Sequence, residues 1–224
     1  MKIEFFGAAR EVTGSKHLIH ANGKKILLDC GMYHGHRQEA WDKNHSFPCD
    51  PKEIDAVILS HAHIDHSGLI PYIVRKGYSG PIYCTNATRD LSTHMLNDSG
   101  YIQERDAEYI NKKKKKKGEP LVKPLYTIED STKAMNQFTG VGYDRAFVVE
   151  EGVVACFYDA GHILGSAVVH LIVYEKDKNK RTYIGFTGDL GRKNIPILRD
   201  PVVLPKTQYL ITECTYGDRF HETN

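Results

Sequence analysis

The stretch "LSHAHIDHSG", residues 59–68, places three histidines and an aspartate within six positions, directly after an apolar run. These residues are His61, His63, Asp65 and His66. The preceding segment, "IDAVILS", is typical of a buried strand that ends where the histidines begin. A solvated loop does not require three histidines, whereas a metal site does: imidazole nitrogen and carboxylate oxygen are the ligands that zinc prefers at hydrolytic sites. The stretch therefore predicts a metal site at the end of a strand.

The spacing within this stretch predicts two ion positions rather than one. In an extended segment His61 and His63 point the same way and can share one ion. Asp65 and His66 lie one turn later, where a helix is expected to begin, and can reach a second ion nearby. Two ions about 3.5–4 Å apart stabilise both the attacking and the leaving oxygen of a phosphoryl displacement.

Other predicted strand ends also carry residues of the types that bind metals. Because residues at the same end of adjacent strands converge, we expect these side chains to reach one pocket. An aspartate that ends a strand, such as Asp29, is also common as a turn residue, whereas His162 and Asp189 indicate a site most strongly when they are taken together. The four residues that follow strands in this way are Asp29, His162, Asp189 and Glu213. The isolated histidines are expected to be hydrogen-bonded core or surface residues: His17, His20, His94 and His170.

The composition is that of an ordinary globular protein. The chain has 224 residues, of which 41 % are hydrophobic and 26 % charged, and its net charge of +2 is too small to imply a polyanionic partner. No apolar run is long enough to span a membrane, and the N-terminus lacks the features of a signal peptide. The five cysteines are scattered without a CxxC pair. This pattern favours reduced thiols in a cytoplasmic setting.

The order of elements predicts two packed sheets with helices outside. The first thirty residues are expected to form strands, including a hairpin at Asn22-Gly23. Helices are expected at residues 66–76 and 89–110, and a third follows the capping-box pair Thr127 and Asp130. The remainder of the chain is rich in strand patterns.

At this level of detail the chain resembles a known family. "HAHIDH", with "DCG" before it, "GHILGS" after it and "TGDLG" last, resembles the metallo-β-lactamase superfamily. "GAAREVTGSKHLI" and "ITECTYGDR" are similar to its RNA-processing branch, the β-CASP nucleases. The resemblance implies an α/β fold, the αββα metallo-β-lactamase sandwich of two mixed sheets with outer helices.

The resemblance also implies a role for each candidate residue. It implies that His61, His63 and His162 hold a first zinc ion, Asp65 and His66 hold a second, and Asp189 bridges the two. Asp29 would orient these ligands by hydrogen bonding. Asp65, Asp189 and Glu213 would be catalytic, in the cleavage of an RNA phosphodiester by a hydroxide held between two zinc ions.

The resemblance implies an incomplete domain. Residues 1–212 would form the metallo-β-lactamase domain without its C-terminal return, and residues 213–224 would begin a β-CASP cap that this chain lacks. In the family, two histidines after the cap complete the second zinc site and pair with the residue matching Glu213. We therefore expect a weak second zinc site and little activity from the chain alone, with a second copy or a C-terminal half supplying the missing ligands.

A run of six lysines in "NKKKKKKGEP" is expected to lie in a loop. It is either a solvated loop or a contact for the phosphate backbone of RNA, the partner that the resemblance implies. No aromatic residue suited to base stacking can be picked out among the 13 tyrosines. The candidate RNA-binding residues are therefore Lys112, Lys113, Lys114, Lys115, Lys116 and Lys117.

Two alternatives to a ribonuclease stay open. One is a small-molecule hydrolase of the same fold, acting on a thioester, lactam or lactone. The other is a non-catalytic subunit that binds RNA as a scaffold. "ECTYGD" and the long segment between His66 and His162 argue against the first, and the retention of all six expected zinc ligands argues against the second.

Overall fold

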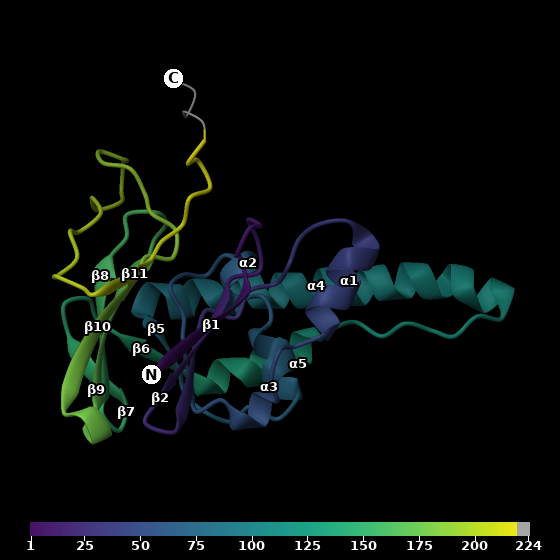
Figure 1. Cartoon of the computed structure of the whole chain (residues 1–224). Helices are drawn as coiled ribbons and strands as arrows, with labels where there is room; N and C mark the ends of the chain where they lie inside the picture. The colour runs from purple at the N-terminus through teal and green to yellow at the C-terminus, as the bar shows by residue number, and fades with distance from the viewer. Residues whose placement is uncertain (219–224) are drawn as a thin grey trace.

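The computed structural model describes residues 1–218, apart from the side chain of Arg37, and shows two β-sheets packed face to face (Figure 1). The predicted metallo-β-lactamase sandwich of two mixed sheets is confirmed. Residues 219–224, which belong to the segment expected to begin a cap, lie outside the described residues.

The first sheet has six strands in chain order, antiparallel from β1 to β3 and parallel from β3 to β6. The predicted hairpin joins β2 to β3. Asn22 and Gly23 have φ angles of 52° and 78°, as the right-handed twist of a two-residue hairpin requires. The strands are β1 (Lys2–Gly7), β2 (Lys16–Ala21), β3 (Lys24–Leu28), β4 (Ala56–Ile58), β5 (Ile82–Thr85) and β6 (Phe138–Val141).

The second sheet has five strands and packs on the first through a fully buried layer that includes Ile19, Ile26, Phe157 and Leu171. Its strands are antiparallel except for the pair β10 and β11. Strands β8, β10 and β11 therefore run in the same direction, and their carboxyl ends lie at the same edge. The order is β11 (Tyr209–Ile211), β10 (Lys180–Phe186), β9 (Ala167–Glu175), β8 (Val153–Asp159) and β7 (Ala146–Glu150).

Within the described residues, the α-helices lie on the side of the first sheet (Figure 1). A second buried cluster, including Leu27, Val57, Leu69 and Tyr126, joins them to it. No helix in residues 1–218 is long and apolar enough to cross a membrane. The helices are α1 (Arg37–His45), α2 (Ile64–Ser67), α3 (Ile70–Arg75), α4 (Asn86–Lys117) and α5 (Ile128–Ala134), with 3₁₀ turns at Pro51–Glu53, Met135–Gln137 and Lys176–Lys178.

The helix predicted at residues 66–76 is two helices, α2 and α3, separated by Gly68 and Leu69. Pro71 lies in the first turn of α3. Because proline has no N–H to donate, it suits the start of a new helix better than the interior of a continuous one.

The loop predicted for the lysine run is wrong, because the run forms the last turns of α4. Lysine favours helix, and positive side chains at a helix C-terminus interact favourably with the helix dipole. The helix ends at Gly118, which has the left-handed φ of 67° that a C-terminal cap requires. The helix expected at residues 89–110 is accordingly longer at both ends. The residues that are helical instead of looped are Lys112, Lys113, Lys114, Lys115, Lys116 and Lys117.

Candidate metal centre

The five predicted strand ends converge at one edge of the sandwich. Asp29 follows β3 directly, and the histidine stretch follows β4 after Leu59 and Ser60. The strand ends of the second sheet bring the remaining residues to the same place. In chain order these are His162 after β8, Asp189 after β10 and Glu213 after β11.

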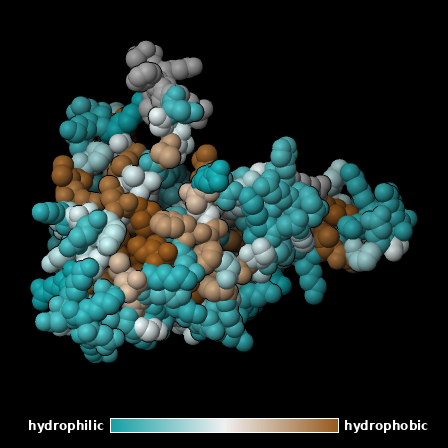
Figure 2. All heavy atoms as spheres, viewed as in Figure 1, coloured by the Kyte–Doolittle hydropathy of each residue, from teal (hydrophilic) through white to brown (hydrophobic). Residues whose placement is uncertain are grey.

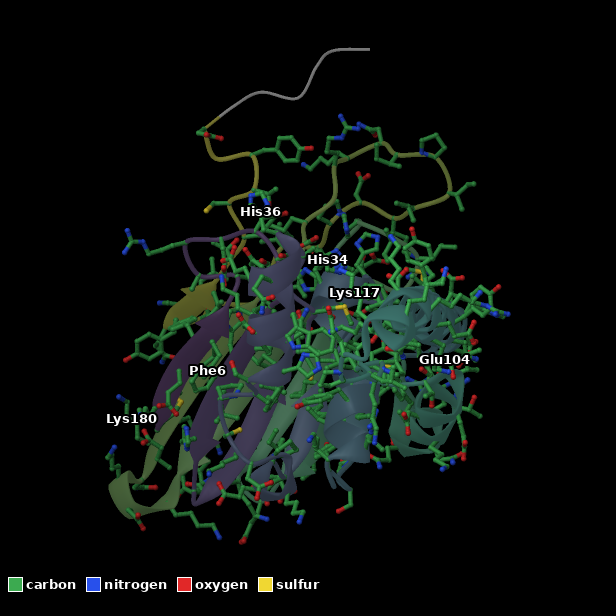
Figure 3. All side chains as sticks on the ribbon, turned by 90° about the vertical axis from the view of Figure 1, so that its right-hand side faces the viewer. Phe6, His34, His36, Glu104, Lys117 and Lys180 are labelled. Carbon is green, nitrogen blue, oxygen red and sulfur yellow. The ribbon has the colours of Figure 1, made fainter. Side chains whose placement is uncertain are left out.

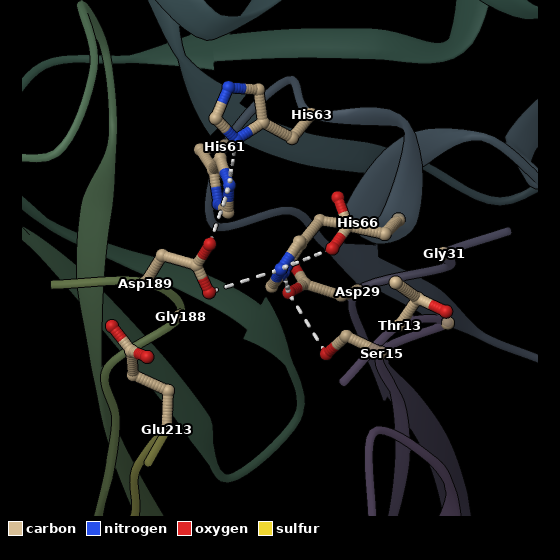
Figure 4. Close-up of polar contacts among 12 residues, drawn as sticks. Thr13, Ser15, Asp29, Gly31, His61, His63, His66, Gly188, Asp189 and Glu213 are labelled. Atoms are coloured by element: carbon tan, nitrogen blue, oxygen red, sulfur yellow. Dashed lines mark hydrogen bonds and ion pairs between the residues drawn. The ribbon is translucent and has the colours of Figure 1, made fainter. Parts of the chain in front are cut away.

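Four side chains form a first group of ligand atoms, His61, His63, His162 and Asp189, within 4.8 Å of one another. His61 Nε2 lies 3.1 Å from His63 Nδ1, which lies 3.2 Å from His162 Nε2. Asp189 Oδ2 lies 3.7 Å from His61 Nε2 and 3.5 Å from His162 Nε2. Figure 4 shows His61 and His63 on one side of the Asp189 carboxylate.

These distances fit a tetrahedral metal ion. Zinc–nitrogen bonds of about 2.0–2.1 Å place neighbouring ligand atoms about 3.4 Å apart along the edges of a tetrahedron. Three imidazole nitrogens facing one another cannot all be joined by hydrogen bonds, because each nitrogen of a neutral ring carries either a proton or a lone pair, never both. Around a cation all three lone pairs are satisfied. The donor set is therefore a metal-binding cluster.

A second group shares Asp189 with the first. His66 Nε2 lies 3.2 Å from Asp189 Oδ1 and 3.8 Å from Asp65 Oδ2. The two oxygens of Asp189 thus face different groups, as a carboxylate bridging two ions would require. The second group has only three protein side chains among the described residues.

Asp29 is fully buried and fixes the orientation of His66. Its Oδ2 lies 2.6 Å from His66 Nδ1, and it also accepts hydrogen bonds from the Ser60 and Ser15 hydroxyls at 2.9 and 3.3 Å. Its Oδ1 accepts the backbone N–H of Ser60 at 2.7 Å. With Nδ1 of His66 bonded to Asp29, the other nitrogen, Nε2, points at Asp189 (Figure 4). Such a partner holds a metal-binding histidine in the required tautomer.

The pKa values in the cluster follow from burial and neighbouring charges. Burial, with the adjacent imidazoles, holds the pKa of His61 well below its ordinary value. Burial also lowers the pKa of His162. Burial opposes the charged form of His66, but the carboxylates of Asp29 and Asp189 outweigh it and raise the pKa to about 10. Burial likewise opposes ionisation of Asp189, whereas its bond to His66 lowers the pKa.

Two open clefts meet at Asp189 and Glu213. The larger, of about 770 Å³, is lined by the loop after β1, by His66 and Asp189, and by residues 211–215. Glu213 accepts the backbone N–H of Leu190 at 2.9 Å through Oε1 and that of Thr215 at 3.2 Å through Oε2. One oxygen is thus bonded to the loop that carries Asp189, and the other to the segment that follows Glu213 itself.

Two residues that contribute to this edge were not predicted from the sequence. Ser15 and Ser60 bond to Asp29, and their only sequence signal is a position beside a candidate ligand. His17, expected to be a hydrogen-bonded core or surface residue, is buried between Phe5 and Phe186; its Nε2 lies 3.5 Å from the Ser15 hydroxyl, whereas its Nδ1 has no hydrogen-bond partner among residues 1–218.

The structure does not bring the candidate RNA-binding lysines to the metal cluster. They lie on the last turns of α4, and none of them lines either of the two clefts at Asp189. This separation applies to the whole run: Lys112, Lys113, Lys114, Lys115, Lys116 and Lys117.

Comparison with known proteins agrees with the fold and the site. A family model described as the metallo-beta-lactamase superfamily matches residues 11–153. A ribonuclease from Thermus thermophilus, TTHA0252, is 38 % identical over 99 % of this chain and 45 % of its own length. The transcription termination factor FttA of Methanocaldococcus jannaschii is 32 % identical, and the match covers 97 % of this chain and 32 % of the length of FttA. The cleavage and polyadenylation specificity factor 73 of Drosophila melanogaster is 32 % identical over 99 % and 30 %.

The chain thus spans less than half the length of these curated relatives. Solved structures match at lower identity and bear on the fold alone. A protein of unknown function from Enterococcus faecalis V583 superposes with a TM-score of 0.54 at 16 % identity, over 84 % of this chain and 43 % of the other. A metallo-β-lactamase with a HARLDQ motif from Cronobacter sakazakii gives 0.50 at 14 % identity, over 87 % and 58 %.

Proposed function

The chain belongs to the metallo-β-lactamase superfamily, and we propose that it forms part of a zinc-dependent enzyme that hydrolyses RNA phosphodiester bonds. The predicted resemblance to RNA-processing members is confirmed by the relatives, which include a ribonuclease and the cleavage factor 73. The observation that carries the proposal is the pair of ligand groups on the two oxygens of Asp189. Two adjacent ions suit phosphoryl displacement.

His61, His63, His162 and Asp189 would hold the first ion, and Asp65, His66 and Asp189 the second. When bound, zinc ions neutralise phosphate charge and bring the pKa of water near 7. Asp29 would accept the hydrogen bond from His66 Nδ1–H and so leave Nε2 to bind the ion, which would displace the proton that the raised pKa places there in the metal-free chain. His61, with its depressed pKa, is neutral at pH 7 and therefore ready to bind a cation.

The cleft beside the cluster would receive the RNA. Asp65 and Asp189 would act as catalytic carboxylates through the ions they hold. Glu213 is the third catalytic candidate, because its carboxylate lines both clefts beside Asp189. The six lysines at the end of α4 would contact the phosphate backbone away from the cluster.

Three ligands leave the second ion incompletely coordinated. Water, a second copy of the chain or a further polypeptide segment would complete it, so we propose that the second ion binds more weakly. The segments proposed are a metallo-β-lactamase domain at residues 1–212 and the start of a cap at residues 213–224. All five cysteines are free, and this supports a cytoplasmic setting.

The proposal is tested by incubating the chain, with and without zinc, with labelled RNA, a thioester and a lactam. We expect slow zinc-dependent cleavage of RNA alone, lost in the variant His63→Ala, because that histidine contributes to the first ligand group. Hydrolysis of only the thioester or lactam would overturn the assignment of substrate. RNA binding without any cleavage, even with excess zinc, would favour the scaffold alternative.

A further inference from the structure

The last turns of α4 and the segment after it project from the molecule as an arm, residues 108–124 (Figure 1). The arm is braced by paired hydrogen bonds of 2.9 Å between the side chain of Asn111 and the backbone of Val122. Its lysines are therefore arranged on a helix instead of in a solvated loop. Figure 3 views the molecule from the side on which the arm projects, with Lys117 and Glu104 labelled.

One face of this helix combines an exposed aromatic ring with cations. Tyr109 is 61 % exposed, and Lys113 Nζ lies 4.4 Å from the centre of its ring. Residues three, four and seven positions apart share a helix face, so Lys112, Lys113 and Lys116 lie on the same face as Tyr109, on its C-terminal side. Among residues 1–218 no carboxylate forms an ion pair with these three lysines, whereas Lys114 is paired with Glu119 at 3.3 Å.

This arrangement supplies the aromatic group that the sequence could not identify. We propose that Tyr109 is a stacking platform for an unpaired base of single-stranded RNA, whose neighbouring phosphates lie on Lys112 and Lys116. Base–aromatic stacking combined with a basic surface is the general means of holding single strands. The inference rests on the proposed function for its ligand, and it adds a preference for unpaired RNA.

The preceding turns mark where this face ends. Tyr101 is also exposed, at 48 %, with Arg105 over its ring at 5.2 Å. However, Arg105 is paired with Glu108 at 2.9 Å, and Glu104 and Asp106 add negative charge to these turns, Asp106 on the N-terminal side of Tyr109 on the same face. Phosphate would be repelled there. Most of the arm in Figure 2 has a hydrophilic surface, consistent with contact to a charged partner.

The test measures RNA binding by fluorescence polarisation in the presence of a chelator, so that no cleavage occurs and the metal cluster is empty. We expect Tyr109→Ala to weaken binding of an unstructured uridine-rich RNA roughly tenfold. Tyr109→Phe should restore binding because it keeps the ring. Tyr101→Ala is the matched control and should bind as the unmodified chain does. Circular dichroism checks that each variant keeps its helix.

Salt dependence separates the ring from the lysines. The triple variant Lys112→Gln, Lys113→Gln, Lys116→Gln should lower the slope of log affinity against log salt by about 2, whereas Tyr109→Ala should leave the slope unchanged. Duplex RNA should not distinguish Tyr109→Ala from the unmodified chain, because paired bases cannot stack on the ring.

Equal affinity of Tyr109→Ala and the unmodified chain for the single strand, equal losses on single strand and duplex, or no rescue by Tyr109→Phe would each overturn the inference. Self-association of the chain through Tyr109, with no difference in RNA affinity between Tyr109→Ala and the unmodified chain, would also overturn the inference. Because binding is measured without metal, the zinc-dependent cleavage assay tests the proposed function separately, and loss of the Tyr109 effect refutes only this inference.

Discussion

Replacing Asp29 by asparagine tests how the second ligand group is built. Asp29 has a left-handed φ of 56°, which asparagine tolerates, so the backbone should be retained. With its oxygen kept on the Ser60 N–H, the new amide would direct N–H groups at His66 Nδ1. His66 would then have to accept at Nδ1 and carry its proton on Nε2, the nitrogen that faces Asp189. A protonated Nε2 cannot bind a metal.

The expected effect is confined to one site. Loss of such an orienting partner costs about 10–100-fold in metal affinity, and we expect this loss for the weaker ion only. His61, His63 and His162 make no direct hydrogen bond to Asp29, and His61 is linked to it only through the Ser60 hydroxyl, so these three should bind nearly as before. The metal-free chain should also lose about 2 kcal/mol of stability, because a buried carboxylate that accepts four hydrogen bonds is replaced.

The assay is zinc titration by calorimetry against a competing chelator, with urea unfolding of the metal-free chain. Asp144→Asn is the matched control, because Asp144 is exposed and has a similar φ of 58°. If Asp29→Asn binds zinc at each site with the same affinity as the unmodified chain, the orienting role of Asp29 is refuted. Equal loss at both sites would refute the division of ligands into two groups.

Three further outcomes are expected. Burial lowers the pKa of His17 from 6.5 to about 4, so the unfolded chain takes up its proton first as the pH falls. Unfolding free energy should therefore drop by about 3 kcal/mol from pH 7 to pH 4 through this group; urea unfolding of His17→Gln should show a smaller drop, and an equal drop would exclude His17. Gly31→Ala should lower the unfolding temperature of the metal-free chain, since its Cβ would lie 1.6 Å from the backbone oxygen of Asp65; an unchanged temperature in calorimetry would contradict the packing. Replacing all six lysines, Lys112–Lys117, by glutamine should flatten the salt dependence of RNA binding, and an unchanged slope would leave the lysines as solvated side chains.

Much of the fold could be predicted because local signals agreed with the overall arrangement. Asn22-Gly23 turned as expected, and the capping box of Thr127 and Asp130 begins α5. The convergence of Asp29, the histidine stretch, His162 and Asp189 follows from strand ends meeting at one edge of two packed sheets. Each signal depends on a few neighbouring residues, which is why sequence alone carries it.

The features that the sequence did not predict depend on contacts between segments that are distant in the chain. The lysine run could be read as a loop because charge repulsion disfavours order, but the bonds between Asn111 and Val122 join residues whose contact no local pattern indicates. The break between α2 and α3 combines a local signal, Pro71, with a tertiary constraint that no local pattern indicates: the N–H of Leu69 donates to the Cys30 carbonyl at 2.8 Å. The hydrogen bonds of Ser15 and Ser60 to Asp29 likewise appear only when three segments meet.

The most direct test of the central claim is anomalous diffraction at the zinc edge from crystals grown with zinc. The account predicts a strong peak bonded to His61, His63 and His162, and a second, weaker peak near His66 and Asp65, with Asp189 between them. Each should lie about 2.0–2.2 Å from its ligand atoms. Absence of any peak at this edge of the sandwich, or a single peak that excludes Asp189, would contradict it.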